Sequence, residues 1–127
     1  MEEIILIASN NEKISLSKEA AMQSKLLETL INDLLDDDKP IFNFYDIKYE
    51  ILKKIVDYLN YYNNNKHKEI NRVIAIYDFE SEMNKWDIEY TNIDINIIID
   101  LIYAANFFDI KSLIEFLAIK IKRTKNR

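Results

Sequence analysis

The sequence predicts a mixed α/β domain in which short strands come first and helices make up most of the rest. A short apolar segment at residues 3–8 and a segment of alternating polar and apolar residues at 12–16 stand near the N-terminus, and both have the length of strands. Later segments repeat apolar residues every three or four positions, which is the spacing of an amphipathic helix. Of the 127 residues, 49% are hydrophobic, so the chain can bury a core of its own. We therefore expect residues 1–127 to form a single domain.

Turn and capping residues predict the first elements. Asn10 and Asn11 separate these two segments, and because asparagine tolerates left-handed backbone, the segments are expected to pair as a β-hairpin. Ser17 and Ser24 each precede a helical pattern, which predicts one short helix and a second helix that reaches residue 35. Residues 41–44 predict a third short strand.

The middle of the chain is predicted to hold one long helix and an additional strand. Asp46 is the expected N-cap of a helix over residues 47–62, whose apolar positions recur at helical spacing. Residues 63–71 are polar and predict a loop. Residues 72–79, RVIAIYDF, are rich in apolar β-formers and predict an extra strand.

Three helices are predicted in the last third of the chain. Residues 86–90 indicate a short helix, and Asp94 is the expected N-cap of a longer one. Asp109 is expected to cap the last helix, which runs to Arg123.

The composition argues against several kinds of chemistry. The chain has no glycine, which Walker-type loops and dinucleotide-binding turns need where backbone approaches phosphate. It has no cysteine for disulfides or thiolate zinc sites. The single histidine, His67, has no second ligand at short spacing and is predicted to be an exposed loop residue. We expect no catalytic residue, no cofactor and no metal, and therefore no enzymatic activity.

Charge and hydropathy argue against nucleic acid and membrane as partners. Without the five Lys and Arg of the last eight residues, the formal charge falls from −5 to −10 over residues 1–119. Such an acidic body does not suit non-specific binding to phosphate backbones. No apolar run is long enough to span a bilayer, and the acidic start does not resemble a secretory signal. The sequence thus predicts a soluble protein of the cytoplasm or nucleus.

One helix carries a mixed stripe that needs an explanation. At helical spacing, Asn96, Asp100, Tyr103 and Phe107 share one face of the helix after Asp94, between two apolar flanks. An aromatic residue beside polar neighbours on an exposed face is typical of an interface anchor. Periodicity alone leaves two interpretations open, a partner site or ordinary core packing with a dimer interface covering the remainder.

Several short segments resemble one family, in the same order along the chain. Residues 104–115, AANFFDIKSLIE, resemble the AANYLDIKGLLD segment of the Skp family, the adaptors of SCF-type (Skp–cullin–F-box) ubiquitin ligases. ILKKIV at residues 51–56 is similar to the family's ILKKVI, and WDIEY at residues 86–90 to its WDxEF. Gln23 and Ser24 match its KQS segment, and ASNN at residues 8–11 stands where the family has SSDG. The resemblance extends over residues 3–123.

The resemblance implies a fold, a function and sites. The fold would be BTB/POZ, a small three-stranded sheet with surrounding helices. The function would be that of a non-enzymatic adaptor that bridges a cullin to an F-box substrate receptor. The family's cullin-facing Asn-Tyr pair matches Asn106 and Phe107. The face that would receive the F-box corresponds to Ile99, Ile114, Ala118 and Ile121.

Two departures from the family pattern leave other functions open. The chain ends at Arg127, where the family continues into further helices, so the C-terminal F-box-binding helices are expected to be truncated. Residues 63–85 lack the family's acidic insertion. The alternatives are a decoy that binds cullin without delivering substrate, an adaptor similar to elongin C, and a self-associating BTB module or homodimer.

Overall fold

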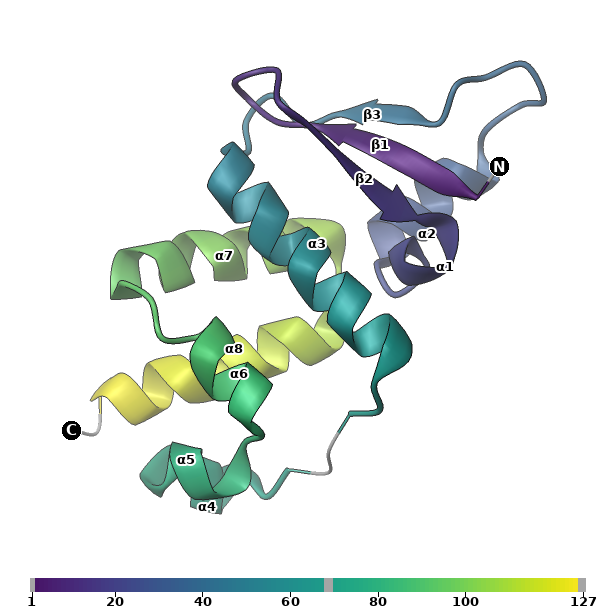
Figure 1. Ribbon diagram of the computed structural model, residues 1–127. Coiled ribbons are helices and arrows are strands. Elements are labelled where there is room, and N and C mark those ends of the chain that lie inside the picture. The colour runs from purple at the N-terminus through teal and green to yellow at the C-terminus, as the bar shows by residue number, and fades with distance from the viewer. Residues whose placement is uncertain (1, 68–69, 126–127) are drawn as a thin grey trace.

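The computed structural model describes residues 2–67 and 70–125 and begins with a three-stranded sheet (Figure 1). β1 (Glu3–Ile7) is the central strand. β2 (Lys13–Ser17) pairs with it antiparallel, and β3 (Ile41–Asn43) pairs with it parallel on the other side. The predicted hairpin and third strand are therefore confirmed.

The hairpin turn is made without glycine. Asn11 has a φ of 65°, in the left-handed region where asparagine costs less than most residues. The Asn10 carboxamide accepts a hydrogen bond from the Glu12 backbone N–H at 3.1 Å. The two asparagines thus supply the geometry and the local hydrogen bond that a tight turn requires.

Serine caps begin the next two helices, as predicted. The Ser17 hydroxyl oxygen accepts a hydrogen bond from the Ala20 N–H at the start of α1 (Lys18–Ala21). The Ser24 hydroxyl oxygen accepts one from the Leu27 N–H at the start of α2 (Lys25–Asn32). Helix α2 ends at Asn32, so the prediction that it reaches residue 35 was wrong. The backbone N–H of Leu35 instead bonds to the Asp38 carboxylate at 2.8 Å, which forms a turn in place of another helical turn.

Ser24 also links the two halves of the chain. Its hydroxyl donates to the Phe108 carbonyl at 2.6 Å, and its side chain is fully buried. We expect Ser24→Ala to lower the free energy of unfolding by about 1–3 kcal/mol, because it removes a cap and leaves a buried carbonyl without its donor. Ser17→Ala removes a cap alone and should cost about 1 kcal/mol. Urea denaturation of both variants measures the difference, and equal losses would contradict the structural role of the Ser24–Phe108 bond.

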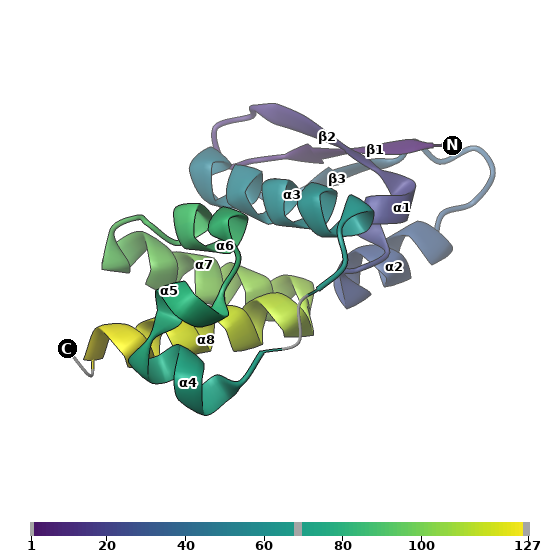
Figure 2. The ribbon, with the colours of Figure 1, turned by 60° about the horizontal axis from the view of Figure 1, so that its bottom comes forward.

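Helix α3 (Tyr49–Asn64) lies between the sheet and the remaining helices (Figures 1 and 2). Its N-cap is Lys48, so the prediction of a cap at Asp46 was wrong. The helix begins later because residues 45–47 form the turn that leaves β3, in which Ile47 N–H bonds to the Phe44 carbonyl at 3.1 Å. One face of α3 is buried through residues at helical spacing, namely Ile51, Leu52, Ile55, Val56, Tyr58 and Leu59.

Two short helices occupy the segment for which a strand was predicted, and that prediction was wrong. They are α4 (Arg72–Tyr77) and α5 (Phe79–Glu82). Asn71 caps α4 by accepting from the Ile74 N–H at 3.1 Å. Ala75 and Phe79, four positions apart, are fully buried. Burial of these two residues against the helical layer outweighs the β-propensity of the sequence.

The last three helices are α6 (Lys85–Tyr90), α7 (Ile95–Phe108) and α8 (Lys111–Lys125). Asp94 caps α7 as predicted and accepts from the Asn96 N–H at 2.8 Å. Asp109 does not cap α8. It has a φ of 53° and ends α7 as a left-handed C-cap, with its N–H bonded to carbonyls of that helix.

A cluster of aromatic residues joins α3, α6 and α8. The Tyr62 hydroxyl donates to the buried Asp87 carboxylate at 2.5 Å, and Tyr58 Oη lies 2.8 Å from Ser112 Oγ. Burial raises the pKa of Tyr58, Tyr62 and Tyr90 above the usual value for tyrosine. These phenols therefore stay neutral and keep their hydrogen bonds at physiological pH.

Within residues 2–67 and 70–125, none of the helices has the length and apolar character needed to cross a bilayer.

Candidate partner-binding site on helices α7 and α8

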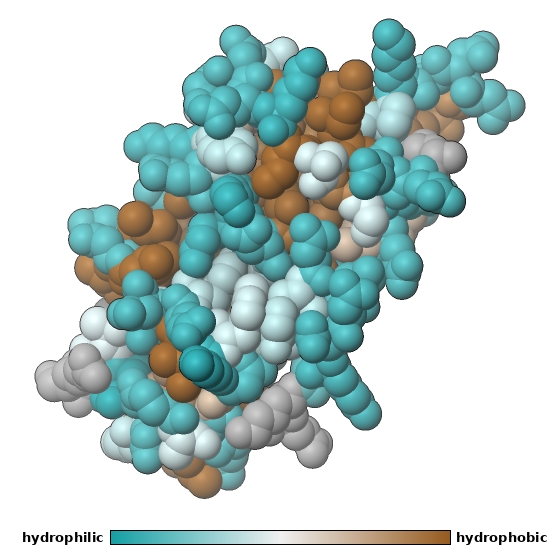
Figure 3. Space-filling view, viewed as in Figure 1, coloured by the Kyte–Doolittle hydropathy of each residue, from teal (hydrophilic) through white to brown (hydrophobic). Residues whose placement is uncertain are grey.

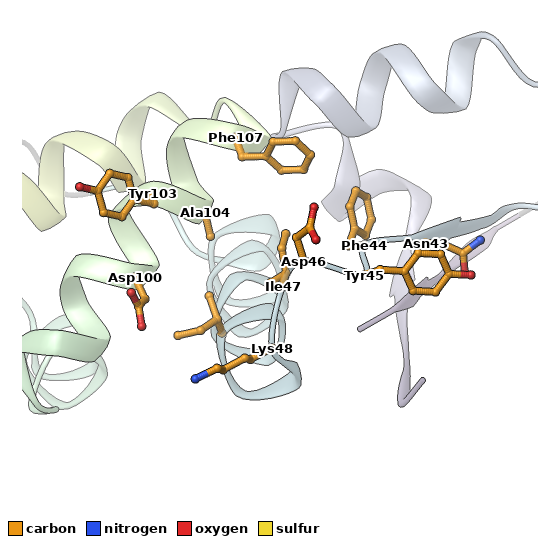
Figure 4. A pocket seen from close by; sticks show the side chains of 11 residues that line it. Asn43, Phe44, Tyr45, Asp46, Ile47, Lys48, Asp100, Tyr103, Ala104 and Phe107 are labelled. Atoms are coloured by element: carbon orange, nitrogen blue, oxygen red, sulfur yellow. The ribbon is translucent and has the colours of Figure 1, made fainter. Parts of the chain in front are cut away.

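A hollow lies between α7 and the connection from β3 to α3 (Figure 4). Its volume is about 660 Å³. Segments about 55 residues apart in the sequence form its two sides. The lining residues are Asn43, Phe44, Tyr45, Asp46, Ile47, Lys48, Ile51, Asp100, Tyr103, Ala104 and Phe107.

Phe107 stands at the edge of this hollow with 55% of its surface exposed. Its ring meets Phe44 edge to face at 6.0 Å and Phe108 at 5.4 Å. Phe44 and Phe108 are themselves buried. Two buried rings therefore hold the Phe107 ring on one side, and its other side is exposed to solvent. This arrangement is typical of an interface anchor.

The mixed stripe predicted on α7 faces solvent. Asn96, Asp100, Tyr103 and Phe107 are all exposed. Tyr103 is 69% exposed, and Tyr45, across the hollow, is 62% exposed. Three large aromatic rings thus surround a floor made of buried Phe44, Ile51 and Ala104. Exposure of several aromatic rings in one patch does not stabilise a monomer, and such patches are typical of surfaces that bind a partner.

Charged side chains stand beside the rings. Asp46 and Asp100 are exposed on opposite sides of the hollow, and Lys48 is exposed near them (Figure 4). Among the residues that the structure describes, no ion pair joins Lys48 to either carboxylate. The hollow therefore combines an apolar floor with a net negative edge.

Asn106 does not line the hollow, although it precedes Phe107. On a helix, consecutive residues point about 100° apart. Asn106 is exposed and lies four and seven residues after Ile102 and Ile99, so it shares their side of α7. A single partner that contacts both Asn106 and Phe107 must therefore extend over the end of α7.

The residues predicted to receive an F-box lie on two helices that pack side by side. Ile99 of α7 is 38% exposed, and Ile114, Ala118 and Ile121 of α8 are half-buried. Figure 3 shows apolar side chains at the surface around the beginning of α7, and others over the strands. The residues predicted to receive an F-box therefore form a partly exposed apolar surface on α7 and α8.

The opposite side of α8 is covered by α4 and α5. Phe116 and Ile119 are each 5% exposed, and the Phe116 ring stacks on Phe79 at 6.0 Å. Arg72 pairs with Glu115, and Arg123 lies 3.6 Å from Glu80. The segment of residues 71–83 therefore covers Phe116 and Ile119.

The described residues show little that could support catalysis or metal binding. In the part of the chain the structure describes, no three His, Cys, Asp or Glu side chains are grouped to hold a metal ion. His67 is exposed as predicted, and its ring stacks on Tyr62 at 3.9 Å. Partial burial lowers the pKa of His67.

Sequence reasoning missed the β3–α3 side of the hollow. No role was predicted for Tyr45, and Asp46 was predicted only as a helix cap. An aromatic residue directly after a strand and outside any periodic pattern was the available signal for Tyr45. The sequence could not place Tyr45 and Phe107 at the same hollow, because their proximity depends on how α7 packs against α3.

The three-stranded sheet and the surrounding helices place the protein in the class of small α/β domains of the BTB/POZ type, with the candidate site on the outer helices. The family model described as "Skp1 family, tetramerisation domain" matches residues 2–64. The S-phase kinase-associated protein 1 homolog of Tetrahymena thermophila is 31% identical over 118 residues, which cover 91% of this chain and 69% of that protein.

Two other relatives are similar over comparable lengths. SKP1-like protein 12 of Arabidopsis thaliana is 27% identical over 88% of this chain and 67% of its own length. The E3 ubiquitin ligase complex SCF subunit sconC of Talaromyces stipitatus is 24% identical over 89% of this chain and 69% of its own length. The chain belongs to the Skp1 family.

Proposed function

We propose that the chain is a non-catalytic adaptor of a cullin-based, SCF-type ubiquitin ligase, acting in the cytoplasm or nucleus. The observation that carries the proposal is Phe107, an exposed aromatic side chain fixed at the edge of an apolar hollow. Its position on a Skp1-family chain, together with relatives named as SCF subunits, supports a cullin as the partner at this hollow.

The second partner is an F-box substrate receptor. The half-exposed residues Ile99, Ile114, Ala118 and Ile121 are where its helix would pack. Asn106 lies on the same side of α7 as Ile99, so it stands between the two proposed surfaces. Helices packed against a shallow apolar surface are a common mode of partner recognition.

The test measures the two affinities separately and then together. The purified chain is immobilised, and the cullin and an F-box protein encoded by the same genome are applied singly and as a mixture. An adaptor binds each and forms a ternary complex. Cullin binding without F-box binding would favour the decoy, and binding of a SOCS-box protein in place of the F-box protein would favour an adaptor similar to elongin C.

Light scattering of the free chain covers the remaining alternative. A mass that rises with concentration, in a chain that binds no cullin, would favour a self-associating module. A chain that binds neither partner would contradict the proposed function.

A further inference from the structure

The sheet has an outer face that none of the described helices covers. In Figures 1 and 2 the helices lie on one side of the strands. Ile4, Leu6 and Leu16 point to that side and are buried in the core. Because side chains alternate along a strand, the residues between them point to the opposite, outer face.

Apolar side chains occupy the centre of this outer face. Ile5 and Ile7 of β1 are half-buried, and neither belongs to the side chains that pack against the core. Ile41 of β3 pairs with Ile5 and is 38% exposed. These three isoleucines, the sheet-face patch, therefore lie side by side in contact with water, and burial of the patch would be favourable.

Opposite charges stand at the two ends of the sheet-face patch. Glu3 precedes the patch on β1, and Lys13 of β2 pairs with Ile7 at the far end. Both side chains are exposed, and within residues 2–67 and 70–125 neither makes an ion pair. The step from Glu3 to Ile7 spans about 13 Å along the strand, so Glu3 and Lys13 of one chain are too far apart to pair.

We propose that a second copy of the chain covers this face, in a symmetric dimer whose two sheets stack with their strands in opposite directions. A two-fold axis that runs across the strands places one sheet-face patch over the other. The same rotation brings Glu3 of each copy beside Lys13 of the other copy. Stacked sheets lie about 10 Å apart, a gap that glutamate and lysine side chains can bridge.

The charges select this orientation and favour a second copy as the occupant. A two-fold axis parallel to the strands would also join the two patches, but it would place Glu3 opposite Glu3 and Lys13 opposite Asn43. Like charges that face each other across an interface are unfavourable. A face whose opposite charges are exchanged by a half-turn is complementary to itself, which is the requirement for an interface between two identical chains.

The interface is small, so the dimer is expected to be weak. The three strands have five, five and three residues, and an interface of this extent belongs to the small, transient class. We expect a dissociation constant of roughly 10–100 μM. Because α3 separates the sheet from α7 and α8, this dimer leaves their surfaces open, and the inference does not depend on binding of a cullin (Figure 1).

Charge reversal on two separate chains tests the inference. Glu3→Lys and Lys13→Glu each convert both ion pairs of the dimer into like-charge contacts, so each variant alone should dimerise about tenfold more weakly than the native chain, or worse. An equimolar mixture of the two variants restores both attractive contacts in a mixed dimer. Its dissociation constant should return to within about threefold of the native value. Sedimentation equilibrium at low salt measures the dissociation constants.

Matched controls make the same charge changes away from the sheet. Glu89 and Lys85 are exposed on α6, which lies on the other side of α3 from the strands (Figures 1 and 2). Glu89→Lys and Lys85→Glu should each dimerise within about twofold of the native chain, since a charge beyond a Debye length is screened. Circular dichroism checks that all four variants keep the native fold.

Three outcomes would overturn the inference. A native chain that stays monomeric at about 500 μM does not form the dimer. Dimerisation of Glu3→Lys and of Lys13→Glu with the strength of the controls would remove the sheet from the interface. A mixture of these two variants that associates no better than either alone would show that Glu3 and Lys13 do not meet across the interface, even if the native chain dimerises.

Discussion

Phe107→Lys is expected to abolish binding of the chain to a cullin while the fold stays intact. The substitution places an ammonium group where an apolar ring would be buried by the partner, and aromatic anchors of this kind commonly carry about 2–4 kcal/mol of the binding free energy. That corresponds to a loss of roughly 30- to 1,000-fold in affinity. Isothermal titration with the cullin, native chain against variant, measures it.

The ring also contributes to the fold, so the variant needs a stability check. Phe107 contacts Phe44 and Phe108 edge to face, and such aromatic pairs are worth about 0.5–1.5 kcal/mol each. We expect Phe107→Lys to unfold at lower urea concentration and to keep its native helical circular dichroism in water. Phe107→Tyr restores the family's hydroxyl and should bind at least as well as the native chain.

A matched control separates the site from a general effect of the new charge. Tyr77 of α4 is 74% exposed and lies outside the residues that line the hollow. Tyr77→Lys should bind the cullin with native affinity. A folded Phe107→Lys protein that binds within twofold of Tyr77→Lys would remove the hollow from consideration as the cullin site.

Phe79→Ala is expected to have the largest effect on stability. Phe79 is fully buried, and its ring stacks on Phe116 at 6.0 Å while Lys120 Nζ lies 4.8 Å from its centroid. Truncation of a buried phenylalanine typically costs about 3–5 kcal/mol, because it removes buried apolar surface and leaves a cavity. Urea denaturation followed by circular dichroism gives the change in the free energy of unfolding.

The loss of Phe79 should also uncover α8. Phe116 and Ile119 would become accessible if α4 and α5 leave their position, and a dye that fluoresces on apolar surface would report this. Tyr77→Ala, on the exposed side of α4, should change the free energy of unfolding by less than about 0.5 kcal/mol. A loss below about 1 kcal/mol for Phe79→Ala would mean that residues 71–83 contribute little to the core.

Local signals predicted most of the secondary structure. Ser17, Ser24 and Asp94 were identified as N-caps from residue type and position, and each makes its capping hydrogen bond. Such bonds form within three residues, so short-range sequence is sufficient to predict them. The exposed stripe on α7 was likewise visible, since helical periodicity places Asp100, Tyr103 and Phe107 together whatever surrounds them.

Elements whose state depends on distant contacts were predicted less well. Residues 72–77 have the composition of a strand and form a helix, because Ala75 and Phe79 pack in the helical layer beside α8. Asp109 looked like an N-cap by residue type. Its left-handed backbone ends α7 instead, and its carbonyl accepts a bond from Lys25 N–H at 3.3 Å, a contact made across the fold.

The candidate site divides in the same way. The sequence by itself determined that Phe107 stands on an exposed, mixed stripe, because the 3.6-residue period of a helix is a local property. Only the tertiary structure decided that Phe44, Tyr45 and Asp46 form the opposite side of a hollow, and that Asn106 does not line it. Packing of α7 against α3 brings those segments together, and no local pattern encodes a contact between residues more than 50 positions apart.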